Sequence, residues 1–208
     1  MQQIHEQRRS QIPKRQLGKE RVRERIVDAA IELHTSIGPA RTTISDIARR
    51  AGVQRLTVYR YFPDELSLLG ACSGTYRRRN PPPDPEDWVK IADPEERLAL
   101  ALPELLRYYR RTAPMLSRIL RDVSVAPLLR QIAGPRLQWA ARVQQVLEAG
   151  WNVRGKRRRL LRAAIVLATD FHAWESLAAN PLDDLEIAAV LSGMVVATAG
   201  SGPPSSSP

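Results

Sequence analysis

The densest group of side chains suited to recognising another molecule lies within one short segment. Its members are polar and carry hydrogen-bond donors: Gln54, Arg55, Thr57, Tyr59 and Arg60. Arginine can form two hydrogen bonds to guanine, glutamine two to adenine, and threonine can touch a thymine methyl group or a phosphate. We therefore predict that this segment reads base edges in the major groove of double-stranded DNA.

Residues nearer the N-terminus are suited to holding the DNA backbone. Arg41, Thr42 and Thr43 precede a predicted helix, and donors close to helix starts commonly contact phosphates. The basic segment 1–19 has no sustained apolar periodicity and is expected to be a flexible arm that adds sequence-independent attraction. The alternative for all of these residues is a charged helix surface exposed to water.

Two short helices must position these side chains. Residues 43–62 read TISDIARRAGVQRLTVYRYF, with Thr43 and Asp46 spaced as a capping box and with Gly52 as a stop. The small, flexible and apolar residues Ala51, Gly52 and Val53 are the sequence that a tight helix-turn-helix requires. Its inner face is expected to consist of the apolar residues Ile47, Ala48, Val58 and Phe62, packed on a first helix through Ile26, Ala30 and Leu33.

The charge distribution agrees with a nucleic-acid-binding N-terminal part. Residues 1–63 contain thirteen Lys or Arg and six Asp or Glu, whereas residues 64–208 contain nineteen and sixteen. Most of the net charge of +10 therefore lies in the first third of the chain. A generally arginine-rich composition is the alternative explanation of the charge alone.

Helical periodicity continues along the rest of the chain, and no strand pattern persists, so the predicted fold class is all-α. The first helix is predicted from Val22 to Ile37, and later helices over residues 94–112, 114–123, 127–132, 135–149, 156–179 and 182–198. Pro103 is expected to kink or break the helix over residues 94–112. Asn80–Pro85 marks a loop. We predict a basic arm (1–19), a DNA-binding domain (20–80), a helical domain (81–199) and a disordered tail (200–208).

Several functional classes are disfavoured. One cysteine and three scattered histidines supply neither a disulfide nor a metal cluster, and no Glu-x-x-His motif of a metal-binding bundle is present. We predict no enzyme activity and no cofactor. No signal peptide or bilayer-spanning run is found, so a cytoplasmic protein without membrane contact is expected.

The helical domain contains aromatic and polar residues that could line a ligand pocket. Those selected as candidates are Tyr109, Trp139, His172 and Trp174. The alternative is that the aromatic residues belong to the core and that His172 is exposed. The basic run 156–159 is interpreted as a solvated helix start.

The N-terminal residues resemble the TetR family of bacterial regulators. The resemblance covers residues 20–80 and rests on both residue type and spacing. It includes the glycine after the first helix, the turn and the recognition helix: Gly38, Thr42, Thr43, Asp46, Ile47, Ala48, Ala51, Gly52, Val53, Thr57, Val58, Tyr59, Tyr61 and Phe62.

This resemblance implies a ligand-responsive homodimer, usually a repressor, that binds a palindromic operator and releases it when an unknown small-molecule effector binds the C-terminal domain. The helices at about 156–179 and 182–198 would then form the dimer interface. An effector-independent or architectural DNA-binding protein, or an activator, is the alternative.

Two residues depart from the family pattern. Gln54 stands where the family usually has Ser or Thr at the start of the recognition helix, and glutamine is a poorer cap. Glu65 stands where the family commonly has a lysine that contacts phosphate, so that contact is not expected here. Arg60 or residues 77–79 could replace it, although residues 77–79 are also typical of a solvated helix end.

Overall fold

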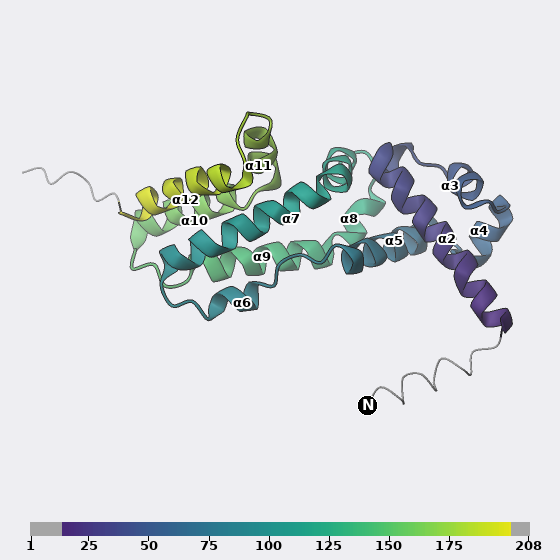
Figure 1. Ribbon diagram of the computed structural model, residues 1–208, viewed down its shortest axis with the longest axis horizontal. Coiled ribbons are helices and arrows are strands. Elements are labelled where there is room, and N and C mark those ends of the chain that lie inside the picture. The colour runs from purple at the N-terminus through teal and green to yellow at the C-terminus, as the bar shows by residue number, and fades with distance from the viewer. Residues whose placement is uncertain (1–13, 201–208) are drawn as a thin grey trace, which may run out of the picture. The chain divides into compact units, whose positions relative to one another are not determined.

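The computed structural model describes residues 14–200, and these residues form helices and loops with no β-strand among them (Figure 1). The predicted all-α class is confirmed. The first helix, α2 (Lys14–Ser36), begins earlier than Val22 because residues 14–21 include strong helix formers such as lysine, arginine and glutamine. Residues 14–19 of the predicted arm are therefore helical. The remainder of the arm and residues 201–208 of the predicted tail lie outside the described residues.

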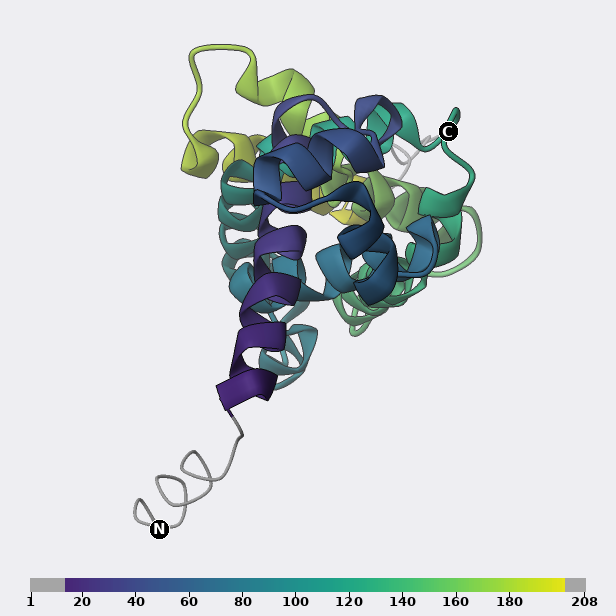
Figure 2. The same ribbon diagram turned by 90° about the vertical axis from the view of Figure 1, so that its right-hand side faces the viewer.

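The chain divides into two compact units, and residues 114–132 belong to the N-terminal one. That unit contains α2, a 3₁₀ turn over Pro39–Arg41, α3 (Ile44–Ala51), α4 (Arg55–Tyr61) and α5 (Glu65–Arg79), with the end of α7 (Pro94–Asp122) and α8 (Leu128–Ile132). Helix α2 contacts both α3 and α5, as two views of the ribbon show (Figures 1 and 2).

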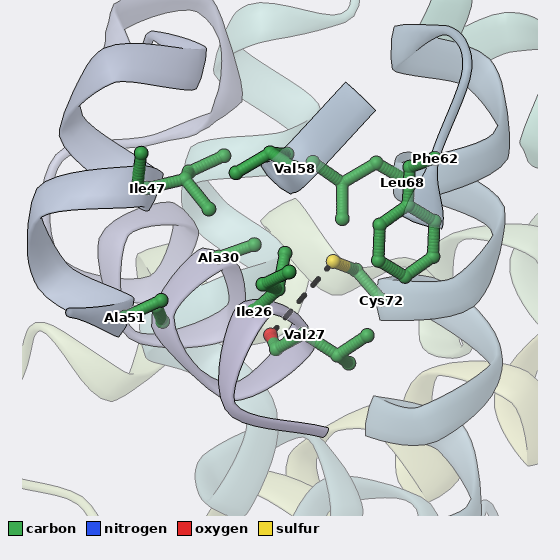
Figure 3. Packing of buried hydrophobic residues seen from close by; sticks show 11 residues of the cluster. Ile26, Val27, Ala30, Ile47, Ala51, Val58, Phe62, Leu68 and Cys72 are labelled. Atoms are coloured by element: carbon green, nitrogen blue, oxygen red, sulfur yellow. Dashed lines mark hydrogen bonds between the residues drawn. The ribbon is translucent and has the colours of Figure 1, made fainter. Parts of the chain in front are cut away.

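The core of the N-terminal unit is formed by the inner faces of α2, α3, α4 and α5. Figure 3 shows Ile47 and Val58 directed toward Ile26 and Ala30, as the sequence predicts. Leu33 is half-buried and packs on the same cluster. Cys72 of α5 is also buried there, and its thiol is 3.9 Å from the carbonyl oxygen of Val27. Burial raises the pKa of this thiol to about 12, so it is not a reactive thiolate at neutral pH.

The second unit is a bundle built around the first part of α7. Its other helices are α6 (Pro85–Val89), α9 (Gly134–Glu148), α10 (Gly155–Ala168), α11 (Phe171–Ala178) and α12 (Asp184–Gly200). Helix α9 contacts α6 and α10, and α12 contacts α10 and α11 (Figure 1). Helix α7 presents an apolar stripe to this core: Leu98, Ala101, Leu102, Leu105, Leu106 and Tyr109.

Helix α7 is continuous through Pro103 and Pro114. Of the kink or break expected at Pro103, the break was wrong and the kink stays a prediction, and the separate helix predicted over residues 114–123 was wrong. A proline inside a helix removes one hydrogen bond and costs about 3 kcal/mol. The burial of large apolar side chains along α7 offsets that cost, because each contributes about 1.5–3 kcal/mol.

The single helix predicted over residues 156–179 was also wrong, because the helix is interrupted at Thr169 and Asp170. The Asp170 carboxylate accepts hydrogen bonds from the backbone N–H groups of His172 and Ala173 and starts α11 as its N-cap. An aspartate competes well for such N–H groups, which favours a new helix start over continuation of the old helix.

The end of α7 is bonded to the loop that follows α2. Arg118 Nε donates to the carbonyl oxygen of Ser36 at 2.6 Å, and Arg121 Nη2 to that of Ile37 at 3.0 Å. The buried Asp122 carboxylate accepts from the backbone N–H of Ala40 at 3.0 Å. These bonds explain why residues 114–132 pack with the N-terminal unit, which differs from the single boundary near residue 80 that the sequence suggests.

Replacing Gly38 by alanine is expected to destabilise the protein. Gly38 has a φ of 94°, and a Cβ atom there would lie 2.5 Å from Asp122 Oδ2. The backbone strain alone is on the order of 1–3 kcal/mol. Urea denaturation should show a clear fall in the free energy of unfolding. Gly70→Ala is the control, because nothing lies within 4 Å of a Cβ at this helical position and a gain of roughly 0.5–1 kcal/mol is expected. Unchanged stability of Gly38→Ala would contradict the proposed clash.

Candidate nucleic-acid interface

Helix α3 begins with the predicted capping box. The Thr43 hydroxyl oxygen accepts from the backbone N–H of Asp46 at 3.1 Å, and Asp46 Oδ2 accepts from the backbone N–H of Thr43 at 3.2 Å. Hydrogen bonds from the Thr43 hydroxyl and backbone are the main reason that the pKa of Asp46 lies below its usual range. The start of α3 is therefore fixed by two reciprocal bonds.

The two threonine hydroxyls predicted to contact phosphates already have partners. The Thr42 hydroxyl donates to the carbonyl oxygen of Gly38 at 2.8 Å, and that of Thr43 donates to Asp46 Oδ2 at 2.6 Å. A phosphate contact through either hydroxyl would replace an existing bond, so their role stays a prediction. Arg41 is exposed, as a backbone-contacting residue must be.

The turn between α3 and α4 depends on Gly52, as predicted. Gly52 has φ 64° and ψ 41°, a left-handed conformation that glycine adopts without steric cost. The backbone N–H of Val53 donates to the carbonyl oxygen of Ala48 at 3.0 Å, which closes the end of α3. The turn sets the direction in which α4 leaves α3.

Helix α4 is buried along one side and exposed along the other. Val58 is buried and Phe62 follows the helix into the core, while Gln54, Arg55, Tyr59 and Arg60 are exposed and Thr57 is half-buried. The structure thus brings the five predicted base-reading residues onto one short element, with four of them open to solvent. Whether they contact bases stays a prediction.

Arg55 and Tyr59 form a coupled pair on the exposed side of α4. Arg55 Nη2 donates to the Tyr59 hydroxyl at 3.2 Å, and the guanidinium carbon lies 5.6 Å from the centre of the tyrosine ring. This cation–π contact restricts the arginine rotamer before any DNA arrives. A preorganised side chain loses less conformational entropy on binding.

Leu56 is a surface residue that the sequence interpretation missed. It lies beside Arg55 on α4 and is 69% exposed. An exposed aliphatic side chain among the predicted base-reading residues is suited to a thymine methyl group. The sequence alone offered a weak signal, because a leucine between polar residues is more simply interpreted as part of the buried face.

Gln54→Ser is expected to stabilise the recognition helix. Gln54 is the N-cap of α4 with extended backbone angles, but its side chain makes no capping hydrogen bond, as the sequence suggests. Serine at this position can accept from an N–H group of the first turn and should raise the free energy of unfolding by about 0.5–1 kcal/mol. Chemical denaturation checks this, with Gln54→Ala as a control that cannot cap. Equal stability of the two variants would contradict the explanation.

The candidate ligand-binding residues of the second unit already use their polar atoms within the protein. The Tyr109 hydroxyl donates to the carbonyl oxygen of Thr169 at 2.7 Å, and the Trp174 indole to Asp184 Oδ1 at 3.2 Å. Trp139 donates to the carbonyl oxygen of Pro83 at 2.9 Å, and His172 is exposed, 3.3 Å from Glu175. The buried rings of Tyr109 and Trp174 pack with Phe171. Ligand contact by these four residues stays a prediction.

Across residues 14–200, no group of three or more acidic, histidine or cysteine side chains is arranged to hold a metal ion. Within the same range, no helix is sufficiently long and apolar to span a bilayer.

Comparison with known proteins agrees with the helix-turn-helix geometry. Residues 26–72 match the model of the tetR family of bacterial regulatory proteins. An uncharacterized HTH-type transcriptional regulator of Mycobacterium tuberculosis is 40% identical over 90 residues, which cover 42% of this chain and 43% of that protein. The matched part is thus less than half of that relative.

Solved structures share the fold over most of the chain. A TetR-like transcriptional regulator from a Rhodococcus species superposes with a TM-score of 0.62 at 17% identity, covering 92% of this chain and 100% of the other. NalD of Pseudomonas aeruginosa, the secondary repressor of the MexAB-OprM multidrug efflux pump, gives a TM-score of 0.56 at 22% identity, with coverage of 86% and 96%. The family match is confined to residues 26–72, which contain the helix-turn-helix, and the likeness to the solved structures is one of fold.

Proposed function

We propose that this protein represses transcription by binding a palindromic operator as a homodimer and that a small molecule releases it. The observation that carries DNA binding is the exposed side of α4, where Gln54, Arg55, Tyr59 and Arg60 project from a helix whose other side is buried. A rigid helix with donors on its outer side is the geometry of major-groove recognition. The basic N-terminal third supplies attraction to phosphates.

We propose repression and not activation, because a regulator can block transcription simply by occupying its DNA site. NalD, which has the same fold, is a repressor. Deleting the gene should raise the transcripts of genes whose control regions the protein binds. A fall in those transcripts would instead support activation. No change, together with DNA binding that has no sequence preference, would support the architectural alternative.

The homodimer is proposed from an apolar surface on α10 and α12. After Glu186, α12 has no charged residue, although many of its positions are exposed. A helix that is apolar on all sides is typically buried. The two helices contact each other, and together they expose large apolar side chains: Leu160, Val166, Leu167, Leu185 and Val190. A second copy of the chain would cover this surface.

Val190→Arg is expected to convert the dimer to a monomer. Val190 is 54% exposed on α12, so arginine is tolerated in the isolated chain but places a charge in the proposed interface. Sedimentation velocity measures the change. Leu100→Arg on α7, at a side chain that is 50% exposed, is the matched control and should remain dimeric. A dimeric Val190→Arg protein would place the interface elsewhere.

Release by a small molecule is proposed from the family resemblance. The effector is expected to lower the affinity for operator DNA, which fluorescence anisotropy of a labelled duplex measures across a compound collection. If no compound that binds the protein changes the anisotropy, the effector-independent alternative is favoured.

A further inference from the structure

The N-terminal unit contains a cavity that the proposed function does not use. Its volume is about 360 Å³, within the range of about 300–1,000 Å³ found for small-molecule sites. All its walls belong to this one unit: the last turn of α2, the loop after it, the start of α3, the start of α5, and residues 125–129. The cavity therefore lies beside the helix-turn-helix and not in the helical domain where the family resemblance places an effector.

The polar group inside the cavity is His34, at the end of α2. Its side chain is 6% exposed and lines the cavity, yet its ring makes no hydrogen bond with any residue in the range 14–200. Burial lowers the pKa of His34 to about 4, although the negative charge of Asp122 opposes this shift. At neutral pH the ring is uncharged and offers one donor and one acceptor. Because His34 lines the cavity, a molecule bound there can hydrogen-bond to its ring.

The charge at the cavity favours a cation. Glu65, on the first turn of α5, is the one charged residue in its lining, and no ion pair to Glu65 is found among the described residues. Asp122 is not in the lining but acts on His34 through its charge. Its carboxylate already accepts hydrogen bonds from Arg121 at 2.7 Å and from the backbone N–H of Ala40 at 3.0 Å, and the charge of Arg41 also attracts it. No lysine or arginine lines the cavity to attract an anion.

The rest of the lining favours an apolar body for the ligand. Ile47 and Leu68 are buried core residues that reach the cavity, and Leu129 closes it from α8. We propose that this cavity binds a small organic cation, with its ammonium group between Glu65 and the ring of His34 and its apolar part against Ile47, Leu68 and Leu129. Glu65, which departs from the family pattern, would thus serve ligand binding. This inference does not depend on DNA binding.

Three probes of similar size but different charge test the proposal: benzylamine, benzyl alcohol and benzoate. The full-length protein is titrated with each, and binding is followed through the ring resonances of the histidines. Benzylamine is expected to shift the His34 signals saturably and to bind on the order of tenfold more tightly than benzyl alcohol, with benzoate weakest. The exposed His172, in the other unit, should not respond.

Charge variants test whether Glu65 itself binds the ammonium group or whether the probe is attracted by the overall charge of the protein. Glu65→Gln should reduce the affinity for benzylamine to that for benzyl alcohol and leave benzyl alcohol binding unchanged. Glu95→Gln, which makes the same change on the first turn of α7, should alter neither. Ala126→Phe should abolish binding of all three probes by filling the cavity. If Ala126→Phe does not fold by circular dichroism, Val125→Phe, at an exposed residue of the same lining, replaces it.

Benzoate binding as tightly as benzylamine would overturn the proposal, as would an unchanged benzylamine affinity in Glu65→Gln. Absence of any saturable His34 shift with benzylamine would also overturn it.

Discussion

Arg55→Ala is expected to weaken specific DNA binding by about ten- to a hundredfold at each half-site, because a bidentate contact to guanine contributes about 1–3 kcal/mol of discrimination. The effect should be larger on a complete operator, where a dimer loses two such contacts. Binding to unrelated duplex DNA should fall far less, since phosphate contacts dominate that binding. Competition between operator and unrelated duplexes in fluorescence anisotropy measures the difference directly.

Matched variants identify what Arg55 contributes. Tyr59→Phe removes the hydroxyl that accepts from Arg55 but keeps the ring beneath the guanidinium, so a smaller loss is expected. Arg107→Ala, an exposed arginine of α7, controls for net charge and should bind normally. Equal losses for operator and unrelated DNA in Arg55→Ala would show that Arg55 contacts only the backbone, and normal binding would mean that the recognition helix is misassigned.

Arg97→Met is expected to lower the free energy of unfolding by about 3–5 kcal/mol. The guanidinium of this buried residue donates to the carbonyl oxygens of Ile91 and Ala92, before α7, and of Val146 and Ala149, at the end of α9. Methionine retains an apolar stem but no donor. Each buried carbonyl left without a partner costs about 1–3 kcal/mol, and water can reach only part of them.

Arg97→Lys should fall between the wild type and Arg97→Met, because an ammonium group cannot reach four divergent carbonyls. Arg107→Met on the exposed side of α7 should have little effect. Urea denaturation followed by circular dichroism provides the comparison. Arg97→Met with wild-type stability would mean that water replaces the guanidinium without loss.

The helix-turn-helix could be predicted from the sequence because its determinants are local. Thr43 with Asp46, and Gly52 alone, fix a helix start and a turn through neighbours within four residues, and the structure confirms both. Asp64 likewise accepts from the backbone N–H of Ser67, three residues later, near the start of α5. Apolar spacing then identifies which side of each helix is buried.

The remaining features depend on contacts between distant residues. Pro103 breaks no helix because α7 has buried apolar side chains on both sides of it, and α7 is bonded to residues far away in the sequence, such as Val146 through Arg97 and Thr169 through Tyr109. The end of α7 joins the N-terminal unit through bonds such as that from Ala40 to Asp122, 82 residues apart. Neither the continuity of α7 nor the packing of its end with the N-terminal unit can be predicted from a local sequence pattern.

In the candidate site, too, the features with local determinants could be predicted and those that depend on distant contacts could not. The residues of α4 could be assigned because helical periodicity separates Val58 from its exposed neighbours. The coupling of Arg55 to Tyr59 follows from their spacing of four but depends on rotamers that packing selects. Glu65 could be recognised as unusual from the sequence, whereas its place in the lining of a cavity with His34 required the fold.

Selection of bound DNA from a random duplex pool by the full-length protein tests the central claim most directly. The account predicts an enriched motif with two-fold symmetry, because a symmetric dimer presents two copies of α4 to two half-sites, and it predicts that Arg55→Ala loses the enrichment at one base pair of each half-site. Recovery of a pool without a shared motif, or of the same motif with Arg55→Ala, would contradict it.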